Sequence, residues 1–171
     1  WNLYSRFEKY FIKLFTDERQ MHTQIFLDCS ASMGKADPDK ANYAVAMAAA
    51  LGFLSVHNMD KVSFKLIRGD RAEDPFGLLV GKRAFFRAVS ELENLTFTGD
   101  SDCETGTRDG LTVIISDFFT DSDWRKAVNF LKYKSRQVLL VQVLTREELD
   151  PTYNGHVSLI DSESEDMMDD R

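Results

Sequence analysis

Cysteine is scarce in this chain, which has only two among its 171 residues. Cys29 and Cys103 lack the close spacing of a zinc-binding or redox motif. Neither a disulfide framework nor a structural zinc site is therefore indicated, and a reducing compartment fits best.

Long hydrophobic runs are also missing. The longest apolar run, residues 44–54, is too short to cross a membrane and is typical of a buried helix. No signal peptide is recognisable. We expect the chain to be cytoplasmic. Because it begins at Trp1 rather than Met, we also expect it to be a fragment of a longer protein. Whether that protein carries a membrane anchor upstream is left open.

Positive charge is in deficit, with a formal net charge of −7 that is concentrated in the last eleven residues. This balance argues against a nucleic-acid partner. The hydrophobic content of 43% is that of a globular protein, and the length suits one domain. We expect a single domain over residues 1–160, with an N-terminal entry segment at 1–20 and an acidic tail at 161–171.

Apolar strands alternate with helices along the chain. Strands are predicted at residues 24–27, 61–67, 111–116 and 138–144, and helices at 40–58, 82–95 and 124–134. Residues 76–80 are predicted as the second strand of a hairpin at a sheet edge, and 157–160 as a last short strand. This order predicts an α/β, three-layer, doubly wound, Rossmann-like fold with a mostly parallel sheet and one antiparallel edge strand.

The segment 28–32 is the strongest candidate site. Asp28 ends an apolar strand, and the hydroxyls of Ser30 and Ser32 follow on the same tight turn. Asp117 ends a second apolar strand, and ligands of such sheets bind beyond the carboxyl ends of the strands. Carboxylate and hydroxyl oxygens suit a hard divalent cation. The competing interpretation is ordinary turn and helix-cap chemistry of Asp and Ser.

Most enzyme motifs are absent from the sequence. There is no Gly-x-Ser-x-Gly turn, the three histidines follow no triad order, and Gly34 stands alone without a phosphate-binding or dinucleotide motif. The best enzymatic alternative is a Mg²⁺-dependent phosphatase of the haloacid dehalogenase type, with Asp28 as nucleophile. That chemistry needs a second aspartate two residues later, where this chain has Ser30.

The pattern Asp28-x-Ser30-x-Ser32 resembles the metal-ion-dependent adhesion site (MIDAS) of von Willebrand factor A domains. In that family a loop between the two strands supplies one more hydroxyl, usually from threonine. By alignment Ser101 stands at this position, with Thr98 as the rival and Thr105 or Thr107 as weaker candidates. The resemblance thus implies a metal set of Asp28, Ser30, Ser32, Ser101 and Asp117.

Five segments together resemble the prokaryotic domain-of-unknown-function 58 group. The resemblance implies a von Willebrand factor A-like fold, a bound Mg²⁺ (or Mn²⁺ or Ca²⁺), and a partnership with a MoxR-type AAA+ ATPase or its client. It also implies that an acidic side chain of the partner completes the coordination of the ion, in an interaction module rather than an enzyme. The segments are residues 1–19, 27–33, 115–118, 141–144 with 148–149, and 159–163.

One stretch departs from this family. Residues 103–110 are too short, too polar and too rich in glycine to form the crossover helix that such a domain carries before its next strand. Either the helix is lost or residues are missing there. A third interpretation is therefore a metal-free structural interaction domain with a degenerate site.

Overall fold

The computed structural model describes residues 20–34, 38–68, 71–95, 110–119, 123–151, 158–160 and 167–169. The elements in chain order are β1 (His22–Asp28), α2 (Ala31–Gly34), α3 (Pro38–His57), β2 (Lys61–Arg68), β3 (Arg71–Glu73), α4 (Lys82–Leu92), β4 (Gly110–Ser116), α5 (Trp124–Tyr133), β5 (Arg136–Gln142), α6 (Arg146–Leu149), β6 (Ser158–Ile160) and β7 (Met167–Asp169). The four strands and three long helices predicted for the alternating pattern are present, with ends that shift by a few residues.

The main sheet has five strands in the order β3-β2-β1-β4-β5. β1 lies at its centre and pairs in parallel with both β2 and β4, and β5 pairs in parallel with β4. β3 is antiparallel to β2 and forms one edge. The fold is therefore the expected α/β arrangement, a mostly parallel sheet with one antiparallel edge strand.

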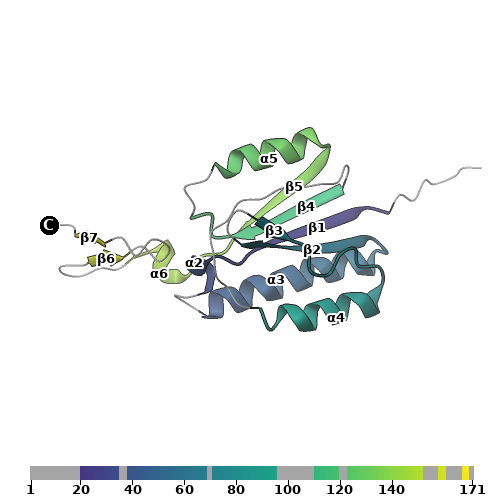
Figure 1. Ribbon diagram of the computed structural model, residues 1–171, viewed down its shortest axis with the longest axis horizontal. Helices are drawn as coiled ribbons and strands as arrows, with labels where there is room; N and C mark the ends of the chain where they lie inside the picture. Colours follow the sequence, from purple (N-terminus) through teal and green to yellow (C-terminus); the bar gives the residue numbers. More distant parts are fainter. Residues whose placement is uncertain are drawn as a thin grey trace, which may run out of the picture.

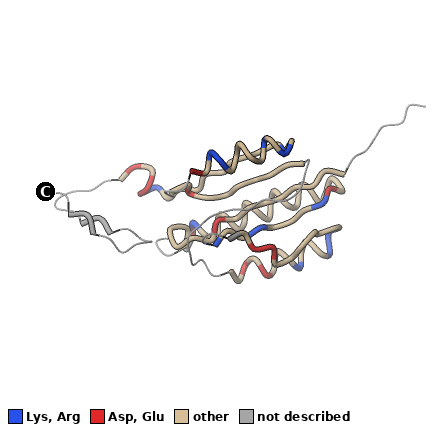
Figure 2. Tube along the Cα trace, turned by 45° about the horizontal axis from the view of Figure 1, so that its top comes forward, with Lys and Arg blue, Asp and Glu red and all other residues tan. Residues whose placement is uncertain are grey.

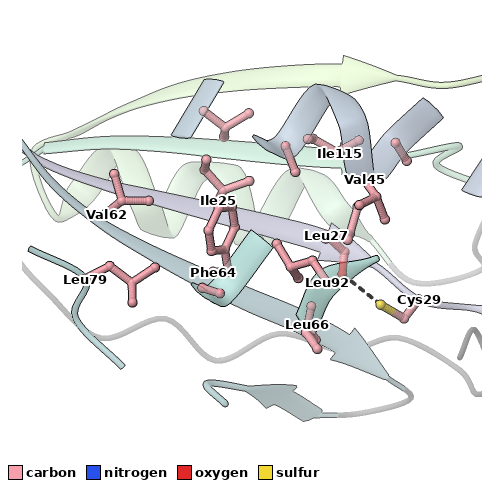
Figure 3. Close-up of a cluster of buried hydrophobic side chains, with 14 of the residues drawn as sticks. Ile25, Leu27, Cys29, Val45, Val62, Phe64, Leu66, Leu79, Leu92 and Ile115 are labelled. Carbon is pink, nitrogen blue, oxygen red and sulfur yellow. Dashed lines mark hydrogen bonds between the residues drawn. The ribbon is translucent and has the colours of Figure 1, made fainter. Parts of the chain in front are cut away.

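Helices lie on both faces of this sheet, with α3 and α4 on one side and α5 on the other (Figure 1). The core lies under α3 and α4, where strand side chains meet the helices (Figure 3). Small residues of α3 bring the helix close to the sheet: Ala44 and Ala48 are fully buried. A Cβ at Gly52 would lie 2.8 Å from the Phe85 ring and 3.0 Å from the Phe64 ring, so only glycine fits.

The predicted hairpin is present, but its second strand is β3, at Arg71–Glu73, rather than residues 76–80. β3 follows β2 almost at once, with Arg68 opposite Arg71. Residues 76–80, where the strand was predicted, form a single antiparallel bridge between Val62 and Leu79. Leu79 is nonetheless buried, so the apolar pattern of this segment reflects packing against the sheet edge rather than a continuous strand.

The strand predicted at residues 157–160 is present as β6, but it does not join the main sheet. It pairs antiparallel with β7 in a separate two-stranded sheet. β7 falls within the residues 161–171 that we expected as an acidic tail, and the domain boundary stays a prediction. Residues 1–19 of the predicted entry segment 1–20 lie outside the described residues. So do residues 103–109, which make up nearly all of the stretch 103–110 that departs from the family pattern. No helix in the described ranges has the length and apolar character needed to span a membrane.

Candidate functional site

Asp28 lies at the carboxyl end of β1, where two hydrogen bonds fix its carboxylate. Ser116, at the end of the neighbouring strand β4, donates its hydroxyl to Asp28 Oδ2 over 2.5 Å. The Ser30 backbone N–H donates to Asp28 Oδ1 over 2.9 Å. The second bond closes a tight turn after the strand, and the first joins the ends of β1 and β4. Asp28 is buried, so this carboxylate is held in a defined orientation.

The two serine hydroxyls of the motif lie beside each other on this turn. Ser30 Oγ and Ser32 Oγ are 3.0 Å apart, at the start of the short helix α2. Cys29, between Asp28 and Ser30, belongs to the hydrophobic core, and its Sγ is 3.6 Å from the Leu27 carbonyl oxygen (Figure 3). Burial raises the pKa of the Cys29 thiol to about 12, so at neutral pH it is protonated and is not a thiolate ligand.

Asp117 follows β4 directly and is almost fully buried, with 1% exposure. The next residue, Phe118, has a left-handed φ of 59°, which is uncommon for an aromatic residue. This turn lets the Phe119 N–H donate back to Asp117 Oδ1 over 3.0 Å. Gln142, at the end of β5, donates its side-chain amide to the Asp117 carbonyl over 3.0 Å. Strained backbone of this kind is characteristic of functional turns.

Lys40, in the first turn of α3, brings a buried positive charge into the same place, which the sequence analysis missed. Its Nζ donates to Asp117 Oδ2 over 2.9 Å, to Glu148 Oε1 over 2.7 Å and to the Ser32 carbonyl over 3.3 Å. The lysine side chain is 1% exposed. An ammonium has three hydrogens to donate, so this lysine is fully paired. We call the Asp117–Lys40–Glu148 arrangement the Lys40 bridge.

Glu148 belongs to α6, a single helical turn that follows β5. Thr145 and Glu148 form a capping box: the Thr145 N–H donates to Glu148 Oε2 over 2.7 Å, and the Glu148 N–H donates to Thr145 Oγ1 over 3.1 Å. One carboxylate oxygen of Glu148 thus closes the cap, and the other binds Lys40. Figure 2 shows acidic positions on α6, in contrast to the basic positions along α5.

The charges of the Lys40 bridge stabilise each other. Burial by itself would lower the pKa of Lys40, but hydrogen bonds to Glu148 and Asp117 outweigh it and raise that pKa. Burial would raise the pKa of Glu148, but hydrogen bonds from Lys40 and from the Thr145 backbone outweigh it and lower that pKa. Both side chains are therefore charged at neutral pH.

The lowered pKa of Glu148 predicts a pH-dependent contribution to stability. A carboxyl whose pKa falls on folding stabilises the folded state above its unfolded pKa, near 4.5, and loses this effect as pH falls through the lower folded value. Glu148→Gln should therefore reduce the free energy of unfolding by about 1 kcal/mol at pH 7. The difference from the parent protein should shrink steadily below pH 4.5, as measured by urea unfolding at a series of pH values.

Glu147→Gln is the matched control, because Glu147 is an exposed carboxylate in the same turn of α6. It should change the free energy of unfolding at pH 7 by less than about 0.5 kcal/mol. Equal losses in the two variants at pH 7 would contradict a specific role for the contact between Glu148 and Lys40.

Four of the five predicted metal ligands gather at the carboxyl edge of β1 and β4. These are Asp28, Ser30, Ser32 and Asp117, whereas Ser101 and its rival Thr98 lie outside the described residues. Their donor atoms are carboxylate and hydroxyl oxygens, the set that a hard divalent ion prefers. Among the described residues, no three histidine, cysteine or acidic side chains cluster as a metal site. The role of these residues as ligands therefore stays a prediction.

Solved structures with the same fold include three from distant sources. An aerotolerance-related membrane protein from Bacteroides fragilis, with multiple mutations to serine, is 22% identical with a TM-score of 0.51, over 88% of this chain and 77% of that one. Manganese-loaded TRAP protein from Plasmodium vivax is 16% identical, with a TM-score of 0.51 and coverages of 72% and 57%. Proximal thread matrix protein 1 from the mussel byssus is 11% identical, with a TM-score of 0.56 and coverages of 77% and 40%.

These identities establish a shared fold and no more. No curated protein is significantly similar to this sequence. A family model described as "Protein of unknown function DUF58" matches residues 1–169, which is almost the whole chain. Together with a von Willebrand factor A-like fold, this match shows that the chain belongs to the DUF58 family.

Proposed function

We propose that this domain is a metal-dependent protein-interaction module, which binds an acidic side chain of its partner through a divalent ion at a MIDAS-type site. The observation that carries the proposal is the gathering of Asp28, Ser30, Ser32 and Asp117 at one edge of the sheet. Mg²⁺ is the expected ion, with Mn²⁺ or Ca²⁺ as alternatives. One structural relative with this fold is described as manganese-loaded, which supports the class of ion.

The donor set explains why such a site would attract an acidic partner. The hydroxyls of Ser30 and Ser32 are neutral, and the carboxylates of Asp28 and Asp117 at most balance a divalent charge. When bound, the ion would supply a positively charged coordination position that a further carboxylate can occupy. The hydrogen bonds that orient Asp28 keep its carboxylate in place before any ion arrives, which reduces the cost of assembling the site.

The proposed partner is a MoxR-type AAA+ ATPase or one of its clients. Membership of the DUF58 family supports this choice, because the resemblance described above implies such a partnership. Affinity capture from cells with this chain as bait, in Mg²⁺ and in EDTA, would test it. Enrichment of an AAA+ ATPase in Mg²⁺ alone is the expected result, and equal recovery in EDTA would contradict a role for the ion.

Asp28→Ala should weaken both Mn²⁺ binding and partner binding by about tenfold or more. The substitution removes one of two carboxylates from a site with few charged donors, and losses of tenfold or more are expected from removal of a single good ligand, about 1.4 kcal/mol or more. Isothermal titration of Mn²⁺ measures the first effect, and partner binding in Mg²⁺ measures the second.

Asp123→Ala is the control, because Asp123 is an exposed aspartate before α5 whose ion pair with Lys126 is loose, at 3.7 Å. It should bind the ion and the partner as the parent protein does. The mechanism would be wrong if EDTA or Asp28→Ala left the affinity for the partner unchanged.

The Lys40 bridge favours a second candidate, an interaction domain that works without metal. The lysine ammonium already neutralises Asp117, which reduces the negative charge available to an ion. Titration of Mg²⁺ and Mn²⁺ separates the two candidates, because a metal-free domain would bind neither ion. Such a domain would also bind its partner equally well in EDTA.

We also propose that the domain is not an enzyme. A haloacid dehalogenase-type phosphatase would need an acid or base at position 30, where the Ser30 hydroxyl instead lies 3.0 Å from that of Ser32. Phosphatase activity on a generic substrate, lost in Asp28→Asn, would overturn this proposal.

A further inference from the structure

Asp117 is fully engaged within the chain. Its Oδ1 accepts the Phe119 N–H over 3.0 Å, and its Oδ2 accepts a hydrogen bond from Lys40 over 2.9 Å. The carboxylate is 1% exposed, and so is the lysine side chain. A divalent ion that binds Asp117 must therefore either replace the lysine bond or share one carboxylate with a nearby ammonium.

Sharing is unfavourable because it would place two cations against the same buried carboxylate. Like charges at a few ångströms repel strongly where water is excluded, and a divalent ion carries twice the charge of the ammonium. The ammonium is also not solvated, since its other bonds go to Glu148 and to the Ser32 carbonyl. We therefore expect the ion to replace Lys40 as the cation that binds Asp117.

Displacement of Lys40 has a direct consequence for α6. Glu148 is bound at 2.7 Å by the lysine and at 2.7 Å by the Thr145 N–H, so its two carboxylate oxygens tie the capping box to the site. Without the ammonium, Glu148 would lose the one ion pair that it makes within the described part of the chain, and it would face the buried Asp117 as a like charge. The four-residue helix has little else to hold it, because none of its residues is buried.

We infer that Lys40 and a divalent ion compete for Asp117, so that the Lys40 bridge closes the ion-free site and ion binding releases Glu148 and loosens α6. The lysine then acts as a resident cation whose exit couples the site to the segment after β5. This inference rests on the proposed function, because it requires that an ion binds at the same edge of the sheet.

The test is a titration of Mn²⁺ into the parent protein, Lys40→Met and Lys65→Met, with amide hydrogen exchange of residues 145–150 measured by mass spectrometry. Lys65→Met is the matched control, because it removes a lysine from a more exposed ion pair with Asp74. Competition predicts that Lys40→Met binds Mn²⁺ about tenfold more tightly or better, and that Lys65→Met changes the affinity by no more than about twofold.

Hydrogen exchange tests the release of α6 in the parent protein, without any substitution. Saturating Mn²⁺ should speed exchange of the Glu148, Leu149 and Asp150 amides, which bond within this turn. In Lys40→Met these amides should already exchange fast, and Mn²⁺ should not speed them further. This measurement decides the release of α6 even if Lys40→Met fails to fold.

The possible outcomes separate the two proposals. If the parent protein binds Mn²⁺ but Lys40→Met binds no better, or if exchange in α6 stays the same or slows, the inference is overturned while the proposed function stands. If only Lys40→Met binds Mn²⁺, competition is supported and the metal-dependent function of the parent protein fails. If neither protein binds Mn²⁺, and the control does not either, both proposals fall together.

Discussion

Lys40→Met should destabilise the folded protein by about 3–5 kcal/mol, because it leaves the buried Asp117 carboxylate without its cation. Methionine fills a similar volume, so the loss reports charge rather than a cavity. Asp117 would retain the Phe119 N–H as a donor, and Glu148 would lose its ion pair with Lys40. Urea unfolding at pH 7 in EDTA, which removes any bound ion, measures the change in free energy.

Two further variants make this result specific. Lys65→Met breaks the more exposed pair with Asp74 and should cost only about 0–1 kcal/mol. Asp117→Asn added to Lys40→Met removes the stranded charge and should recover part of the stability, which a double-mutant cycle quantifies. A loss below about 1 kcal/mol in Lys40→Met would show that the folded state does not depend on the ion pair between Lys40 and Asp117.

Phe64→Ala should cost a similar amount, about 3–5 kcal/mol, by opening a cavity in the core. Phe64 in β2 is fully buried. Its ring lies edge-on to Phe76 at 6.3 Å between centroids and is tilted against Phe85 at 6.1 Å. It also lies directly under Gly52 of α3, so the helix and two further aromatic rings all lose contacts when the ring is removed.

Phe86→Ala is the matched control within the same aromatic cluster. The Phe86 ring contacts Phe85 at 5.5 Å and Phe53 at 6.2 Å, but it is 55% exposed. Its truncation should cost about 1 kcal/mol or less. Thermal unfolding of both variants would show the difference directly, and equal shifts in Tm would mean that the ring of Phe64 is not a core element.

The parts of the site that lie on strand ends were predictable from sequence. Asp28 and Asp117 each follow an apolar run, and parallel strands in a doubly wound sheet end at the same edge. The bond from Ser116 to Asp28 shows that the two ends are in fact adjacent. The sequence predicted the shared edge, whereas the pairing of β1 with β4 as neighbours in the sheet comes from the structure.

Lys40 and Glu148 were not predictable in the same way. Lysine in the first turn of a helix is ordinarily exposed, and nothing in its neighbours indicates that α3 directs it into the site. The sequence does contain a local pattern that involves Glu148, since Thr145 with Glu148 three residues later has the spacing of a capping box. Their meeting is set by tertiary packing across 108 residues of sequence.

The hairpin shows a different limit of prediction from the apolar pattern of the sequence. Residues 76–80 have the apolar character of a strand, but the antiparallel partner of β2 is Arg71–Glu73, which has no such pattern. Backbone pairing at a sheet edge depends on how soon the chain turns back, whereas the apolar pattern reports contact with the core. The side chains of Phe76 and Leu79 contact the core, and Leu79 makes the one backbone bridge to β2 within this segment. The pattern was therefore informative about burial but not about the bounds of the strand.

The buried thiol of Cys29 can report how often the candidate site opens. Cys29 lies between Asp28 and Ser30 with no exposed surface, and its sulfur faces the core (Figure 3). A thiol reagent can reach it only when the end of β1 separates from its neighbours. In a Cys103→Ser background, where it is the sole cysteine, its rate of modification would follow fluctuations of the candidate site without any added label.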